Sequence, residues 1–235
     1  MSIVKAPIVL AIDTTDLETA LNWVKATEDL VSVYKLGLEF FLCLGSQGVR
    51  AVADQTQNDI FLDLKLHDIP HTVSGAARAI ASLRPKYLTV HAAGGSAMVA
   101  AAAAAMPLTL VTGVTILTSL SENDVTSIGF KSDALGSAVG LAKIAVAGGA
   151  RAIVCSPLEI LAVRRCVGEE VIIITPGVRP ADSVGNDDQM RTMGPREAID
   201  RGANLVVIGR PITSAWVGGA SAMRERTSEI CAQIL

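Results

Sequence analysis

Short apolar runs rich in β-branched residues recur along the chain, with more polar segments between them. "PIVLAID" and "VIIITPG" are typical, because their apolar residues follow one another almost without interruption. Such runs indicate strands buried on both faces, as in a parallel sheet. Eight runs fit this description, near residues 7–13, 31–37, 59–65, 86–92, 108–117, 151–156, 171–177 and 204–210.

The segments between these runs have helical spacing, for example "DLETALNWVKATEDL" after the first run and "HTVSGAARAIASL" after the third. Strands that alternate with helices predict a parallel sheet. Eight strands in 235 residues favour a closed β/α barrel, with an open doubly wound sheet as the alternative. Ala134 to Ala150 is longer than one crossover needs. No linker or break in composition divides the chain, so we expect one domain over residues 1–235.

One stretch, Ala92 to Ser121, has no charged residue and is long enough to span a bilayer. Gly94 and Gly95 open it, Pro107 interrupts it, and threonines recur in its second half. The pattern therefore predicts an alanine-rich helix followed by a buried strand, and no membrane span.

Composition narrows the possible partners and the compartment. Half of the residues are hydrophobic, and 20 Lys and Arg against 23 Asp and Glu give a net charge of −3, so the chain has no overall basic surface for nucleic acid. Four cysteines form no C-x-x-C pair, which favours a reducing cytoplasm. The apolar run near the start is too short for a signal peptide and ends at Asp13, so we expect no targeting segment.

Polar side chains gather where the predicted strands end. In a β/α barrel the carboxyl ends of the strands converge on one mouth, where the active sites of this fold lie. Packing alone hardly explains so many polar residues at these positions. They are Asp13, Lys35, Asp63, Lys65, His91 and Thr118.

Within this group, Asp63 and Lys65 are two residues apart on one strand, so their side chains should share a face at the mouth. Lys35 on the preceding strand should lie beside them, and Asp68 follows on the loop. A structural ion-pair network is the alternative to a catalytic one.

Three chemical roles compete for Lys65. A Schiff-base nucleophile must be neutral, whereas neighbouring carboxylates favour the ammonium. A metal site on Asp63 and Asp68 is opposed by two lysines and lacks a convincing ligand set. A charged general acid held by carboxylates fits the local electrostatics.

The turns after the last two predicted strands have the composition of a phosphate site. "TPGVRP" follows the seventh strand and "IGRPIT" the eighth, where phosphate sites of these barrels recur. Gly177 and Gly209 taken singly are ordinary turn residues, but Arg210 adds a cationic fork beside them. Gln189 could reach over a bound ligand from the acidic loop before it.

Several strings in one order resemble the bacterial orotidine 5'-phosphate decarboxylase family over nearly the whole chain. They are "LAID", "YKLG", "FLDLKLHDIPHTV", "VTILTS", "TPGVRP", "DDQ" and "VIGRPIT". D-x-K-x-x-D alone also occurs in related barrel enzymes that act on sugar phosphates, whereas the longer D-x-K-x-x-D-I-P-x-T string is specific. His71 stands where the family more often has a polar residue such as Asn.

The resemblance implies decarboxylation of orotidine 5'-phosphate to UMP without a metal or an organic cofactor. It makes Lys65 the proton donor to C6, places Asp63 near the departing carboxylate, and implies a homodimer in which Asp68 and Thr72 serve the partner's site. A sugar-phosphate lyase or synthase, or a barrel that only binds phosphometabolites, are the alternatives. The other implied substrate-binding residues are Asp13, Lys35, Thr118, Pro176, Gly177, Arg179, Gln189, Gly209 and Arg210.

Overall fold

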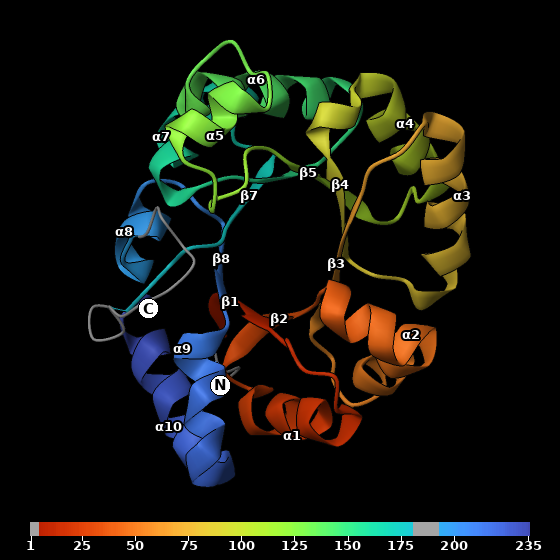
Figure 1. The fold of residues 1–235 in the computed structure, drawn as a ribbon. Coiled ribbons are helices and arrows are strands. Elements are labelled where there is room, and N and C mark those ends of the chain that lie inside the picture. Colours follow the sequence, from red (N-terminus) through yellow and green to blue (C-terminus); the bar gives the residue numbers. More distant parts are fainter. Residues whose placement is uncertain (1–4, 181–192) are drawn as a thin grey trace.

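In a computed structural model, which describes residues 5–180 and 193–235, the strands form one closed parallel barrel (Figure 1). Each strand pairs with the next in sequence, and β8 pairs with β1 to close the ring. The predicted closed barrel is therefore confirmed, and the alternative of an open sheet is wrong. The strands are β1 Ala6–Ala11, β2 Val31–Leu36, β3 Asp59–Leu66, β4 Tyr87–His91, β5 Leu110–Val114, β6 Ala152–Val154, β7 Ile172–Thr175 and β8 Leu205–Ile208.

Helices surround the barrel on the outside (Figure 1). Two helices, α5 and α6, lie between β5 and β6. The segment from Ala134 to Ala150, expected to be longer than one crossover needs, is the single helix α6 followed by a short turn. The helices are α1 Leu17–Thr27, α2 Leu38–Ala53, α3 Pro70–Ile80, α4 Ser96–Ala105, α5 Glu122–Ser127, α6 Ala134–Ala147, α7 Ile160–Val167, α8 Pro195–Asp200, α9 Arg210–Thr213 and α10 Gly219–Ala232.

Two apolar layers explain why the strands are apolar on both faces. One fills the barrel interior and includes Val9, Val33 and Phe61, all nearly or fully buried. The other lies between strands and helices and includes their sequence neighbours Leu10, Tyr34 and Leu62, on the opposite face. Each strand therefore contributes alternately to the two layers, and the continuous apolar runs follow.

The uncharged stretch from Ala92 to Ser121 folds as predicted, into the alanine-rich helix α4 and the buried strand β5. None of the helices in the described ranges is long and apolar enough to cross a membrane. A small residue within this stretch also determines packing, because a Cβ atom at Gly113 of β5 would lie 2.5 Å from the Cβ of Ala145 on α6. Glycine at this position therefore lets α6 pack closely against the barrel.

Apart from β3, the strands are shorter than the apolar runs that predicted them. The fifth run, near 108–117, contributes only Leu110–Val114 to the barrel. Beyond it Thr115 donates a side-chain hydrogen bond to the carbonyl of Val154, and the chain then turns along the mouth. Apolar residues after the strand therefore line the mouth instead of extending the sheet.

Candidate active site

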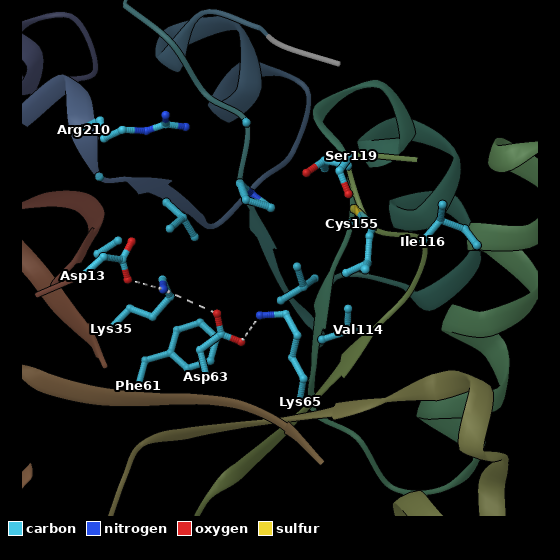
Figure 2. Close-up of a pocket in the computed structure, with 18 of the residues that line it drawn as sticks. Asp13, Lys35, Phe61, Asp63, Lys65, Val114, Ile116, Ser119, Cys155 and Arg210 are labelled. Atoms are coloured by element: carbon cyan, nitrogen blue, oxygen red, sulfur yellow. Dashed lines mark hydrogen bonds and ion pairs between the residues drawn. The ribbon is translucent and has the colours of Figure 1, made fainter. Parts of the chain in front are cut away.

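A pocket of about 380 Å³ lies at the carboxyl ends of the strands (Figure 2). Its position is the one that the barrel prediction gave for the polar residues. The predicted site residues that line it are Asp13, Lys35, Asp63, Lys65, Thr118, Pro176, Gly177, Arg179, Gly209 and Arg210.

Four charged side chains of alternating sign run along one wall of the pocket (Figure 2). Lys65 Nζ donates a hydrogen bond to Asp63 Oδ1 at 2.8 Å. Lys35 Nζ lies 3.5 Å from Asp63 Oδ2 and 3.4 Å from Asp13 Oδ1. The side chain of Asp63 is only 13% exposed, so its charge is compensated by the two ammonium groups rather than by water.

This arrangement governs the protonation of Asp63. Burial would raise the pKa of its carboxyl, but the charges of Lys35 and Lys65 oppose burial. Hydrogen bonds from Lys65 and Thr89 act in the same direction as these charges, and the net result is a pKa below the usual range. Asp63 is therefore a carboxylate at neutral pH and can hold Lys65 in place.

The strand that carries Asp63 and Lys65 is irregular, although their predicted proximity rested on the regular alternation of side chains along a strand. Lys65 has a positive φ of 47°, and β3 shifts register against β4 between Leu62 and Leu66. A non-glycine residue in the left-handed region costs roughly 1–3 kcal/mol and persists only where its surroundings hold it. The prediction that Asp63 and Lys65 are neighbours is confirmed, but a bulge positions Lys65 and simple alternation does not.

Two further predicted residues, Asp68 and Thr72, lie outside the pocket of their own barrel. Both are exposed, on the loop after β3 and in the first turn of α3. Asp68 Oδ1 accepts a hydrogen bond from the backbone N–H of Ile69 at 2.6 Å, and neither residue lines the cavity. The prediction for Gln189 falls outside the described residues.

The two predicted phosphate turns lie on the same side of the mouth. Gly177 has a φ of 76°, in the region that favours glycine. A Cβ atom at Gly209 would lie 3.3 Å from the Cβ of Ala11. The backbone N–H of Arg179 donates to the carbonyl of Met193 at 2.9 Å. In Figure 2 the Arg210 side chain is separated from Lys65 by the width of the pocket, so cationic groups occupy two different parts of it.

Sequence reasoning missed the apolar part of the pocket and the side chain that supports Lys65. Phe61, Ile116 and Cys155 line the cavity, but in the sequence they look like core residues. Thr89, fully buried on β4, hydrogen bonds to Asp63 and to the backbone of Lys65. Its only signal in the sequence was a polar residue between the apolar Leu88 and Val90, inside the run "KYLTVHA".

His91 does not line the cavity, although it ends β4. Its ring packs against that of His67, with centroids 5.4 Å apart. Burial, with smaller contributions from the charges of His67 and Lys65, lowers the pKa of His91.

Among the described residues, no three His, Cys, Asp or Glu side chains are grouped so that they could hold a metal ion.

Fold and pocket together define a class, a β/α-barrel protein whose mouth combines a partly buried Lys-Asp-Lys cluster with two glycine turns and two arginines. Comparison with known proteins gives the family. The model of the orotidine 5'-phosphate decarboxylase / HUMPS family matches residues 6–224, and the chain belongs to this family.

Individual relatives agree with this assignment. The chain is 51% identical over 217 residues to an orotidine 5'-phosphate decarboxylase of Thermobifida fusca, covering 92% of this chain and 93% of the relative. A decarboxylase of the same name from a Wolbachia of Culex pipiens is 44% identical over 92% of this chain and 95% of its own. A crystal structure of orotidine 5'-phosphate decarboxylase from Lactobacillus acidophilus is 31% identical and covers 97% of this chain and 99% of its own, with a TM-score of 0.81.

Proposed function

We propose that the pocket at the barrel mouth binds orotidine 5'-phosphate and that Lys65 donates the proton that replaces its carboxylate. The chain decarboxylates orotidine 5'-phosphate to UMP, the reaction that forms UMP in pyrimidine biosynthesis. The observation that carries the proposed mechanism is the Lys65 ammonium, held 2.8 Å from a largely buried carboxylate inside the pocket.

The difficult step of the reaction is the loss of CO₂ from C6 of the pyrimidine ring. When the bond from C6 to the carboxylate breaks, CO₂ leaves and the electron pair stays on C6, in the plane of the pyrimidine ring. The ring π-system cannot absorb a pair in that plane, so no ordinary electron sink is available. A fixed ammonium beside C6 stabilises the developing charge more than it stabilises the substrate, and this difference accelerates the reaction.

Lys65 would then complete the reaction as a general acid. A proton moves from its Nζ to C6, which gives UMP and leaves a neutral amine that solvent reprotonates. The 2.8 Å hydrogen bond to Asp63 supports this role over that of a Schiff-base nucleophile, because a carboxylate favours the charged form of the amine.

We assign the remaining pocket residues to substrate binding. Asp63 would lie near the departing carboxylate, Lys35 and Asp13 would bind the ribose hydroxyls, and Thr118 would contact the pyrimidine. The phosphate would lie among the two turns and their arginines, far enough from C6 that its binding energy can serve to close the site. The residues proposed around the pyrimidine and phosphate are Pro176, Gly177, Arg179, Gln189, Gly209 and Arg210.

We further propose that the protein is a homodimer in which each chain lends Asp68 and Thr72 to its partner's site. Both residues are exposed and lie outside the pocket of their own chain, which supports this arrangement. In a two-fold symmetric dimer each chain would give one pair and receive one.

The proposed function also includes the domain organisation, the partners and the cellular compartment of the protein. We propose that residues 1–235 act as one catalytic domain in the cytoplasm, with the nucleotide as substrate and without nucleic acid or a membrane as partner. All four cysteines, Cys43, Cys155, Cys166 and Cys231, are free thiols, which a reducing compartment preserves.

The reaction itself is tested by incubating the purified protein with orotidine 5'-phosphate and following the loss of its ultraviolet absorbance. We expect rapid formation of UMP and CO₂, with full activity after exhaustive EDTA treatment. Binding without product would contradict decarboxylation, and activity lost to EDTA and restored by a divalent cation would contradict the proposed mechanism.

Arg210→Ala should chiefly weaken the binding of phosphorylated ligands. The loss of one charged hydrogen bond costs about 1.5–3 kcal/mol, so the Kd for UMP should rise roughly 10- to 150-fold. Uridine, which has no phosphate, serves as the matched ligand, and its affinity should change little. Isothermal titration calorimetry with both ligands measures the difference, and an unchanged affinity for UMP would place the phosphate elsewhere.

A further inference from the structure

The backbone around Lys65 departs from the pairing that the rest of β3 follows. Phe61 pairs with Tyr87 and Leu62 with Leu88, but the next pair is Leu66 with Val90. Residues 63 to 65 of β3 therefore lie opposite the single residue Thr89 of β4. Such a bulge leaves backbone groups without their ladder partners and redirects the side chains that it carries.

Thr89 fills this bulge with one hydroxyl group. Its Oγ1 accepts a hydrogen bond from the backbone N–H of Lys65 at 2.8 Å and donates one to Asp63 Oδ1 at 3.0 Å. The same Oδ1 accepts the hydrogen bond from Lys65 Nζ at 2.8 Å. A closed ring of interactions therefore joins the backbone of Lys65, through Thr89 and Asp63, to its own ammonium.

Removing the hydroxyl of Thr89 would break this ring at two contacts, one with the backbone of Lys65 and one with Asp63. The partly buried N–H of Lys65 would lose its partner, and an N–H without a partner favours any rearrangement that finds it another. Asp63 would lose a donor that orients its carboxylate, and that carboxylate in turn orients the ammonium. A displacement of a reacting group by about 1 Å can cost two orders of magnitude in rate.

Thr89 itself does not line the pocket and is fully buried, so it would act only through its two partners. We propose that Thr89 is a positioning residue, whose hydroxyl holds the left-handed bulge of β3 and so aims the Lys65 ammonium at the reacting carbon. This inference rests on the proposed role of Lys65 as proton donor.

A second buried threonine of the barrel, Thr112, is connected differently. It is the register partner of Thr89 on β5 and is likewise fully buried. Its hydroxyl donates to the carbonyl of Leu110, on its own strand, and not to a charged side chain. Thr112→Val therefore removes a buried hydroxyl from the next strand without touching the bulge, which makes it a matched control.

The test compares Thr89→Val, Thr89→Ser and Thr112→Val in steady-state kinetics with orotidine 5'-phosphate and in calorimetry with UMP. Valine keeps the branched shape without the hydroxyl, and serine keeps the hydroxyl without the methyl group. For Thr89→Val we expect kcat to fall roughly 10- to 100-fold, because the donor is misplaced. UMP affinity should stay within about threefold of wild type, because the lost alignment matters mainly in the transition state. Thr89→Ser should recover most of the lost kcat, and Thr112→Val should resemble the wild type.

Three results would overturn the proposal. One is a Thr89→Val protein with wild-type kcat, and another is an equal loss of kcat in Thr112→Val. The third is a loss of UMP affinity that accounts for the whole loss of activity. If Thr89→Val does not fold, Thr89→Ala and Thr89→Ser provide the comparison, since they differ only by the hydroxyl. If no variant without the hydroxyl folds, Thr89 is required for folding, and the positioning role is rejected.

Failure of this inference can be told apart from failure of the proposed function. An inactive wild-type protein, or an active Lys65→Ala protein, would contradict the proposed function. An active wild type, an inactive Lys65→Ala and a fully active Thr89→Val would contradict only the role of Thr89.

Discussion

Lys65→Ala should nearly abolish turnover and leave UMP binding largely intact. General acid catalysis contributes roughly 10²- to 10⁴-fold, and the ammonium would also stabilise the carbanion electrostatically, so we expect kcat to fall about 10⁴-fold or more. UMP already carries hydrogen at C6, so its affinity does not depend on an interaction that forms mainly in the transition state. Absorbance kinetics and calorimetry with UMP measure the two quantities.

Lys25→Ala provides the control, because Lys25 is exposed on α1 and does not line the pocket. Its kinetics should match those of the wild type. If Lys65→Ala loses UMP affinity as strongly as it loses kcat, Lys65 is part of a structural ion-pair network and not the proton donor.

Lys65→Ala and Asp68→Ala proteins, each nearly inactive alone, should recover activity when they are unfolded together and refolded as a mixture. If Asp68 serves the partner's site, one site of a mixed dimer carries both defects and the other carries neither. Random pairing makes half of the dimers mixed, so roughly a quarter of wild-type activity should return. Kinetics of the refolded mixture measure the recovery, and native mass spectrometry counts the mixed dimers.

The matched control is a mixture of Lys65→Ala and Asp63→Ala proteins. Both residues line the pocket of their own barrel, so every site in every dimer keeps one defect and no activity should return. If the Asp68 mixture behaves like this control although mixed dimers are present, Asp68 serves its own barrel and the shared site is rejected.

The barrel could be predicted from the sequence because its physical cause is visible there. Strands such as Ile172–Thr175 are buried between the barrel interior and the helices, and this requires the continuous apolar runs that the sequence displays. Their ends were harder to place, because Ile116 is apolar whether it extends a strand or lines the mouth. The residue types near a strand end do not show where the chain stops pairing with the neighbouring strand.

The charged wall of the site was also predictable, since Lys35, Asp63 and Lys65 stand out at the ends of apolar strands. The bulge was not predictable, because no glycine marks the positive φ at Lys65. The hydrogen bond that holds it runs from the backbone of Lys65 to the hydroxyl of Thr89, twenty-four residues further along the chain. A contact between strands leaves no local pattern in the sequence.

The central claim is that an ammonium group at position 65 performs the chemistry, and Lys65→Cys permits a direct test. Alkylation with 2-bromoethylamine gives a side chain that differs from lysine only by a sulfur in place of one methylene. Iodoacetamide gives a neutral side chain of similar length. Wild-type protein treated in the same way controls for reaction at Cys43 and Cys166, which are at least partly accessible.

The decisive measurement is the kcat of the two alkylated Lys65→Cys proteins with orotidine 5'-phosphate, after mass spectrometry has shown that the introduced thiol is completely modified. We expect the aminoethylated protein to gain at least about 10²-fold over unmodified Lys65→Cys, and the neutral adduct to gain nothing. An aminoethylated protein that binds UMP but stays inactive, or a neutral adduct that recovers as well, would contradict the claim.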